Sequence, residues 1–409
     1  MAVLDTIAPE AREGVGRIGA ADLVIALPSC HSGELLSAVV AGLLPVLQVA
    51  LPNRRVVLLH PDRAIAVPQE EQSAAESSFH LLPYPLSPAE RYHDQSVDQG
   101  LRSLLHVGRT LGARACVMIG SDVTATPDEL LALAEPVLNH GYDLAVPLYP
   151  RRKFAGLINS GIVYPLTRAL YGARLRFPMA MDLALSVKLA DLYLAAGYAQ
   201  PGWVATRAVC AGLEVCQVHQ ESAPTPAGPE ATDLSASLAQ ILSALFVELE
   251  RNAGSWQKVR GSRPVRTFGL PRTLERETAS VEVGAMVETF KRGCRDLLDI
   301  WAVVLSPATL VELRKIAKLP VDRFRLGDQL WVHVICDFIL GHRQRVVSRE
   351  HLLRALTPIY LGWVASYALE VQDSPPEAVE DRVEKLCASF ETLKPYLLSR
   401  WRWPDRFNP

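Results

Sequence analysis

The chain has 409 residues, of which 49% are hydrophobic, and its 42 lysines and arginines nearly balance its 44 aspartates and glutamates. This composition excludes an intrinsically disordered chain, a collagen-like repeat and a small disulfide-stapled domain. Because the formal net charge is only -2, no global field recruits nucleic acid or an anionic membrane, and any polyanion site must be local. We expect no nucleic-acid partner, and the length predicts two domains.

The cysteines and the N-terminus indicate a cytoplasmic protein without a membrane span. The seven cysteines form no C-x-x-C pair, and several lie in apolar runs such as residues 115–118, as expected of reduced, buried thiols. The first residues lack the basic and apolar regions of a signal peptide. The most membrane-like stretch, Leu35 to Pro52, is short and is interrupted by Gly42 and Pro45, so we predict a buried helix there.

Short apolar runs alternate with helical patterns in the first half of the chain. The third predicted helix has Thr126 as its N-cap and Pro127 at its first position. Strands that alternate with helices predict an α/β fold with a mostly parallel sheet. The predicted strands are 23–27, 56–59, 115–119 and 144–147, and the predicted helices are 32–48, 97–111 and 127–138.

The proline-rich segment 221–230 marks a domain boundary, because after it the apolar residues recur at helical spacing. Helical stripes run over 234–249, 308–318, 327–342, 350–370 and 376–398. We therefore predict a flexible lead-in over 1–20, an α/β domain over 21–225 and an all-α domain over 226–409. The G-x-G-x-x-G run at 14–19 has no strand before it, so we assign it to the lead-in.

Polar residues follow the predicted strands at their carboxyl ends, where α/β folds bind ligands. Pro28 and Ser29 end the first strand, Asp62 follows the second, and Asp122 follows the third beside Gly120. Asp122 has two open interpretations: it holds a divalent cation on a diphosphate, or it caps a turn. The motifs of P-loop ATPases, zinc proteases and α/β-hydrolases are absent from the sequence.

These strand ends, together with segments 149–159 and 162–172, resemble GT-A glycosyltransferases of the family 2 type, which include mannosylglycerate and glucosyl-phosphoglycerate synthases. The resemblance covers most of the chain and extends to 178–182, 202–206, 357–362 and 394–397. It implies a GT-A domain followed by a helical domain. It also implies transfer of a sugar from a GDP- or UDP-linked donor, such as GDP-mannose or UDP-glucose, to a small and in some cases anionic acceptor, with Mg²⁺ or Mn²⁺.

The resemblance also assigns roles to individual residues. Asp182 and Arg151 correspond to catalytic positions, near the acceptor and in the active-site loop. Asp122 matches the last acid of a metal-binding D-x-D, with His219 as a second metal ligand. The residues implied in binding the nucleotide sugar and its charges are Pro28, Ser29, Asp62, Gln99, Ser121, Asp122 and Lys153.

The chain departs from the pattern of that family at four positions. Gly120 and Gly202 stand where acids are usual, Gln99 replaces a lysine, and Pro224 stands where a histidine is expected. A nucleotide-sugar-binding or regulatory module that has lost turnover is therefore an alternative, and we expect Gly120→Asp to raise metal affinity if the site is otherwise intact. A nucleotidyltransferase would need a glycine-rich, basic loop after the first strand, which the sequence does not have.

The basic segment 251–272 and the tryptophans of the helical half each allow a functional and a structural interpretation. Segment 251–272 is basic and contains no acidic residue; it either contacts phosphates, with Trp256 stacking on a base or sugar, or is a solvated linker. Most tryptophans of the helical half lie in apolar stripes and are expected to pack between helices. The run 401–404, which contains Trp401 and Trp403 near the tail, is the exception, and is a candidate for docking on a partner or on a second subunit of a homo-oligomer.

Overall fold

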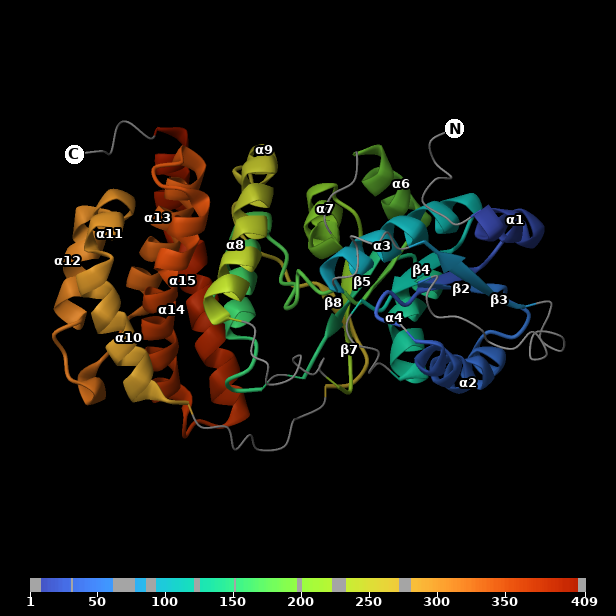
Figure 1. The fold of residues 1–409 in the computed structure, drawn as a ribbon, viewed down its shortest axis with the longest axis horizontal. Helices are drawn as coiled ribbons and strands as arrows, with labels where there is room; N and C mark the ends of the chain where they lie inside the picture. The colour runs from blue at the N-terminus through green and yellow to red at the C-terminus, as the bar shows by residue number, and fades with distance from the viewer. Residues whose placement is uncertain are drawn as a thin grey trace. The chain divides into compact units, whose positions relative to one another are not determined.

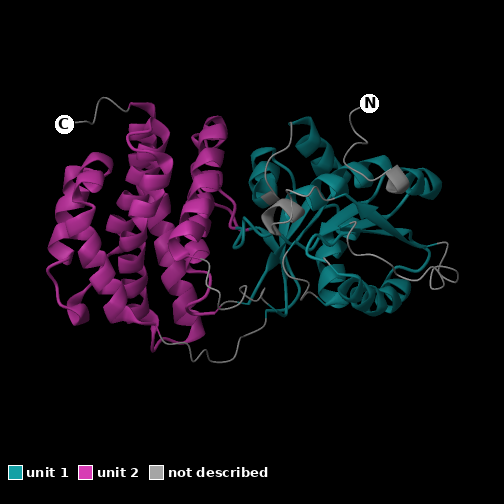
Figure 2. Cartoon of the chain, in the orientation of Figure 1, with its two compact units in different colours: residues 1–150, 175–226, 265–272 teal, residues 151–174, 227–264, 273–409 magenta. Residues whose placement is uncertain are grey.

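The computed structural model describes residues 9–30, 32–61, 78–85, 93–120, 126–150, 152–196, 201–222, 233–271 and 281–403. The chain divides into two compact units (Figure 2). Unit 1 comprises 1–150, 175–226 and 265–272, and unit 2 comprises 151–174, 227–264 and 273–409. Segment 151–174 therefore belongs with the C-terminal helices, and not with the α/β domain to which the sequence assigned it.

Unit 1 is built on one eight-stranded sheet with the strand order β3-β2-β1-β4-β6-β5-β7-β8. All neighbouring strands are parallel except β6, which runs antiparallel to β4 and β5. The predicted α/β class with a mostly parallel sheet is confirmed. The strands are β1 (Leu23–Ala26), β2 (Val56–Pro61), β3 (Phe79–Tyr84), β4 (Ala115–Met118), β5 (Leu144–Leu148), β6 (Leu183–Leu185), β7 (Val215–His219) and β8 (Arg266–Phe268).

Helices cover both faces of this sheet (Figure 1). One face packs against α2 (Gly33–Ala50) and α4 (Pro127–His140). The other face is covered by α1 (Pro9–Ile18), α3 (His93–Thr110), α6 (Val187–Ala195) and α7 (Val204–Cys210), which follows the short 3₁₀ helix η3 (Pro201–Trp203). Because side chains alternate along a strand, Leu23 and Ile25 enter the α2–α4 core while Val24 faces the opposite layer.

Two predictions about the first fifty residues need correction. The predicted flexible lead-in contains helix α1, since Val15 and Ile18 lie on one helical face and are buried. Helix α2 is not buried throughout; only the stripe Leu36, Val40 and Leu43, with Leu47, faces the core. By length and composition alone, α2 and α14 (Arg349–Val371) could cross a membrane, but α14 is largely buried inside unit 2.

Unit 2 is all-α in its described part, as predicted for the C-terminal region. Its first segment contains a π-helix, η2 (Asn159–Val163), which continues into α5 (Tyr164–Tyr171). The remaining elements are α8 (Leu234–Arg251), α9 (Ala253–Trp256), α10 (Val283–Asp296), α11 (Leu298–Val304), α12 (Pro307–Ile316), η4 (Val321–Arg323), α13 (Asp328–Gln344), α14 and α15 (Pro376–Arg402).

Aromatic side chains attach segment 151–174 to these helices. Trp331 and Trp363 stack with their ring centroids 5.5 Å apart, and the indole of Trp331 donates a hydrogen bond to the Gly161 carbonyl at 2.9 Å. A Cβ at Gly161 would lie 2.4 Å from the Trp363 ring, so this position requires glycine. The buried tryptophans of unit 2 therefore serve helix packing, as the sequence predicted.

Helix α5 is held against α15 by buried polar contacts. The Arg168 guanidinium, with a side chain only 5% exposed, pairs with Glu384 and with Glu391. Lys394 donates to three backbone carbonyls, including Ala169 at 2.9 Å and Val259 at 2.7 Å. These partners lie more than 100 residues apart in the chain, which is why local patterns did not place α5 in unit 2.

Candidate functional site

The carboxyl edge of the sheet in unit 1 brings several of the predicted site residues together. Strands β1 and β4 end there, followed by Ser29 and Gly120, and β5 ends there before Tyr149. Because β6 is antiparallel, the residue that precedes it, Asp182, lies at the same edge. Strand β7 ends at this edge with His219. In open α/β sheets this edge is where ligands bind.

The end of β1 is tightly packed. Ser29 is buried, and its hydroxyl donates a hydrogen bond to the Gly120 carbonyl at 3.2 Å, which joins the loops after β1 and β4. On α3, a Cβ at Gly100 would lie 2.6 Å from the Pro28 ring, so glycine allows the helix to approach the strand end. Gln99 is the residue before Gly100 on α3, and its predicted role at the nucleotide site stays a prediction.

Gly120 is fixed by its neighbour across the sheet edge. A Cβ built there would lie 2.8 Å from Cβ and 2.9 Å from the backbone oxygen of Met181. The glycine is therefore a packing requirement, and an aspartate at 120 has no room. The expectation that Gly120→Asp restores a metal ligand is not supported by this geometry. Gly202 differs, because a Cβ there meets only side-chain atoms, of Met179 at 3.4 Å and of Met181 at 3.8 Å.

Asp182 is a buried carboxylate that accepts a hydrogen bond from a tyrosine. It is 5% exposed, and the Tyr149 phenol donates to its Oδ2. Phe177 packs edge-on against the Tyr149 ring at 5.1 Å and fixes its orientation. Burial, and then the negative charge of Asp182, raise the pKa of Tyr149 far above its usual value. The phenol therefore remains a donor, and the carboxylate is held in one orientation.

Glu129 was not predicted as part of the site, although it organises the same edge. Its carboxylate accepts hydrogen bonds from the Thr126 amide at 2.8 Å, the Glu221 amide at 2.8 Å and the Ser222 amide at 3.0 Å. Burial alone would raise the pKa of Glu129, but these hydrogen bonds outweigh it and lower the pKa. The capping pattern at Thr126 was visible in the sequence, whereas the connection to the loop after β7 was not.

The described residues do not provide a complete metal site. His219 ends β7, and burial lowers its pKa, which favours the neutral imidazole that binds metals. However, the described ranges contain no group of three or more histidine, cysteine or acidic residues that could hold an ion. The crowding at Gly120 also leaves no room for an acidic ligand there. The described side chains alone therefore do not form a site for a divalent cation.

The other predicted residues have different outcomes. Lys153 lies in unit 2, where its ammonium group donates to the Gln372 carbonyl at 2.7 Å and its own carbonyl accepts from Tyr367. Trp256 is fully buried and its indole donates to a backbone carbonyl, so of the two interpretations of segment 251–272 the one with Trp256 stacked on a base or sugar is wrong. Four predicted site residues, Asp62, Ser121, Asp122 and Arg151, lie outside the described residues.

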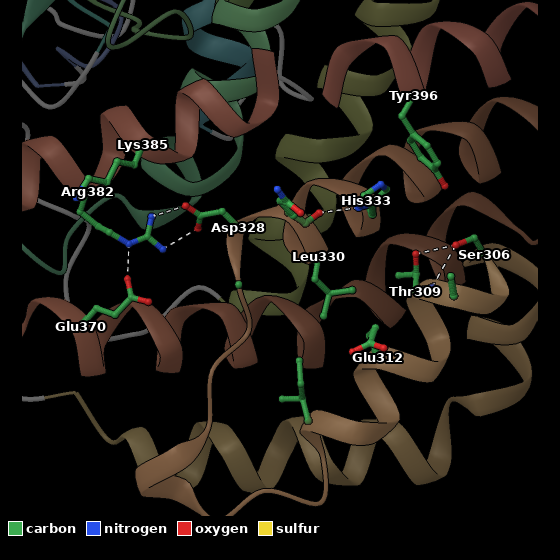
Figure 3. Close-up of a pocket in the computed structure, with 14 residues that line it drawn as sticks. Ser306, Thr309, Glu312, Asp328, Leu330, His333, Glu370, Arg382, Lys385 and Tyr396 are labelled. Carbon is green, nitrogen blue, oxygen red and sulfur yellow. Dashed lines mark hydrogen bonds and ion pairs between the residues drawn. The ribbon is translucent and has the colours of Figure 1, made fainter. Parts of the chain in front are cut away.

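Unit 2 contains a separate pocket of about 870 Å³ between α12, α13 and α15 (Figure 3). At one end Arg382 pairs with Asp328 at 2.7 Å and also with Glu370. At the other end the Tyr396 hydroxyl donates to the buried Asp337 at 2.6 Å. None of the predicted site residues lines this pocket. Its charged groups hold the helices to one another, and they indicate no particular ligand.

Fold and site together define an α/β protein with a polar carboxyl edge and an additional helical unit. No protein-family model matches the chain, and no curated protein matches it. One similar solved structure is glucosyl-3-phosphoglycerate synthase from Mycobacterium tuberculosis in complex with Mn²⁺, UDP and glucosyl-3-phosphoglycerate. The two sequences are 15% identical, the match covers 58% of this chain and 83% of that chain, and the TM-score is 0.36. Another is mannosyl-3-phosphoglycerate synthase from Rubrobacter xylanophilus, at 15% identity, 64% and 81% coverage and a TM-score of 0.39. They are enzymes of the class that the sequence resemblance named.

Proposed function

We propose that the chain is a cytoplasmic glycosyltransferase that transfers a sugar from a GDP- or UDP-linked donor to a small, anionic acceptor. The observation that carries the proposal is the buried, tyrosine-oriented Asp182 at the carboxyl edge of the sheet. A carboxylate fixed at such an edge is suited to accept the proton of an attacking hydroxyl. The packed end of β1, with Pro28, Ser29 and Gln99, is the proposed nucleotide-binding region.

The proposal assigns catalysis to Asp182 and Arg151. Asp182 acts as the general base, or stabilises positive charge that develops on the sugar ring in the transition state. Arg151 neutralises an anionic group, since a guanidinium binds a phosphate or carboxylate through two parallel hydrogen bonds. Asp62, Ser121 and Asp122 complete the proposed contacts to the donor, whereas the ammonium of Lys153, which was also predicted there, donates to the Gln372 carbonyl in unit 2.

Asp122 and His219 are the two residues that we propose as protein ligands of a divalent cation. The crowding between Gly120 and Met181 leaves no room for a second carboxylate two residues before Asp122. If a cation binds, it would neutralise charge on the diphosphate, with substrate and water oxygens as its remaining ligands. The alternative, a module that binds nucleotide sugars without turnover, is an outcome that the test below separates from sugar transfer.

The test is a turnover assay combined with calorimetry. The full chain is incubated with UDP-glucose or GDP-mannose and 3-phosphoglycerate, with Mg²⁺, with Mn²⁺ or with EDTA, and release of UDP or GDP is measured. We expect one donor to be consumed and the acceptor to be glycosylated. Binding of a nucleotide sugar without release of nucleotide would establish the binding module instead. Absence of both binding and turnover for every donor would refute the proposal.

A further inference from the structure

One end of unit 2 is formed by the ends of α8, α13 and α15 and the start of α14. Glu250, in the last turn of α8, accepts a hydrogen bond from Arg349, the first residue of α14, at 3.4 Å. Trp401, near the end of α15, lies under the guanidinium of Arg343 of α13 at 4.1 Å. The same ring packs edge-on against Trp256 of α9 at 5.1 Å. These contacts make the four helix ends one continuous surface.

Cations dominate this surface, which we call the basic end. Glu248 pairs with one of them at 3.8 Å, Glu250 pairs with another, and the exposed Glu350, in the first turn of α14, pairs with Arg354 at 3.2 Å. Because the whole chain has a net charge of -2, a positive excess here leaves the remainder more negative, and such an asymmetry orients a protein toward anions. The six cations of the basic end are Arg251, Lys258, Arg343, Arg345, Arg349 and Arg402.

Helix stabilisation accounts for some of these cations. Arg251, Arg343 and Arg402 lie in the last turns of helices, where positive charge interacts favourably with the helix dipole. Lys258 and Arg345 lie beyond helix ends, and neither forms an ion pair with a residue in the described part of the chain. These two exposed cations need another explanation.

Arg345 also has an unfavourable backbone conformation. Its φ angle is +56°, in the left-handed region where helices usually end with glycine. Any side chain with a Cβ is strained in this region. An exposed arginine there is less favourable for folding than glycine would be, so the stability of the fold does not account for it.

Trp403 adds an exposed aromatic ring beside these cations. It is 60% exposed, whereas the other six of the seven tryptophans are buried. Its chain neighbour Arg402 donates to the side chain of Gln257, the residue before Lys258, so Trp403 and Lys258 belong to the same end of unit 2. Tryptophan beside lysine and arginine is typical of surfaces that enter the headgroup region of a bilayer. Single-stranded nucleic acid is instead bound on several aromatic rings in succession.

We propose that the basic end docks reversibly on an anionic lipid surface. Lys258 and Arg345 contact lipid phosphates, and Trp403 enters the headgroup layer. Because this attraction is electrostatic and involves few residues, the protein leaves the surface when salt screens the charges. The proposed docking is independent of sugar transfer.

Vesicle binding of the full chain tests this proposal. Vesicles of phosphatidylcholine mixed with phosphatidylglycerol are compared with vesicles of phosphatidylcholine alone, by co-sedimentation and by tryptophan fluorescence. We expect binding only to the mixed vesicles, weakening as salt is added, with a blue shift of the emission that Trp403→Phe removes. Equal binding to neutral vesicles, or binding that persists in high salt, would contradict the proposal. Binding to an oligonucleotide in place of the mixed vesicles would also overturn it.

Charge variants locate the surface and separate binding from folding. Lys258→Ala and Arg345→Gly should each weaken vesicle binding about fivefold. Arg345→Gly should at the same time raise the melting temperature, since glycine adopts a positive φ without strain, so lost binding cannot be attributed to unfolding. Lys318→Ala removes an exposed charge after α12 and is the matched control, expected to bind like wild type. Unchanged binding of Lys258→Ala and Arg345→Gly would refute the assignment.

Discussion

The two edges of the sheet in unit 1 each contain a buried aspartate, in different settings. At the amino edge Asp143 accepts hydrogen bonds from the Ser186 hydroxyl at 3.0 Å, the Lys188 ammonium at 3.0 Å and a backbone amide at 3.2 Å. At the carboxyl edge Asp182 is held by Tyr149. Asp143 ties β5 to its neighbours, which is a structural role, whereas Asp182 lies where α/β folds bind ligands. The position in the sheet, more than burial, separates the two roles.

The largest expected effect comes from removing the charge of each aspartate. Asp182→Asn should lower the rate of sugar transfer about 100- to 1000-fold, because a charge aligned with the transition state is lost. Asp143→Asn should leave the rate per folded molecule unchanged and lower the free energy of unfolding by about 1 to 3 kcal/mol. Steady-state kinetics and urea unfolding of both variants measure the contrast. Equal losses of activity would remove the distinction between the edges.

Crowding at the carboxyl edge predicts the next effect. Gly120→Ala should lower the free energy of unfolding by about 1 to 3 kcal/mol, because its Cβ collides with the Met181 backbone. Gly120→Asp should lower the free energy of unfolding further than Gly120→Ala, and should not increase the affinity for Mn²⁺. Gly202→Ala is the control, because its Cβ makes only ordinary contacts with the side chains of Met179 and Met181. If Gly120→Asp were stable and bound Mn²⁺ more tightly, the packing argument would be wrong.

Glu129 makes stability depend on pH. Its pKa is lowered from 4.5 in the folded state, so its contribution is present above that pH and is lost as the pH falls through the folded-state pKa. Glu129→Gln should therefore cost about 1 to 2 kcal/mol at neutral pH and progressively less in acid. Thermal unfolding across this pH range measures the difference, and Glu135→Gln, on the exposed face of α4, is the control. A difference that stays constant with pH would contradict the prediction.

The smallest expected effect concerns the orientation of Asp182. Tyr149→Phe keeps the ring against Phe177 but removes the hydroxyl that holds the carboxylate. Losing one such hydrogen bond should raise the barrier by about 1 kcal/mol, or lower kcat roughly fivefold, with KM nearly unchanged. Tyr142→Phe, whose ring packs against Phe268, should have no effect on transfer. A change in KM alone would assign Tyr149 to substrate binding instead.

The sequence predicted those elements whose signals are local. Strands β1, β2, β4 and β5 lie within a few residues of their predicted positions, because each is a continuous apolar run. The N-cap at Thr126 and the helical stripes after residue 233 are also confirmed. Strands β3, β6, β7 and β8 were missed. Two of them, β6 and β8, have only three residues each and depend on pairing with distant strands.

The candidate site was only partly accessible from the sequence. The strand ends predicted Pro28 and Ser29, and the resemblance predicted Asp182. Three features of the site depend on contacts between separate elements: the hydrogen bond from Tyr149 to Asp182, the crowding of Gly120 by Met181, and the hydrogen bond from the Glu221 amide to Glu129. Such contacts leave no periodic pattern, because they are determined by the packing of elements distant in the chain.

Amide hydrogen exchange with and without UDP-glucose and GDP-mannose tests the central claim most directly. Proposed ligand binding at the carboxyl edge predicts protection of amides near Ser29, Gly120 and Asp182, with no change near Asp143 or Ser186 at the amino edge. Protection confined to the amino edge, or no protection with either nucleotide sugar at saturating concentration, would contradict the proposed site.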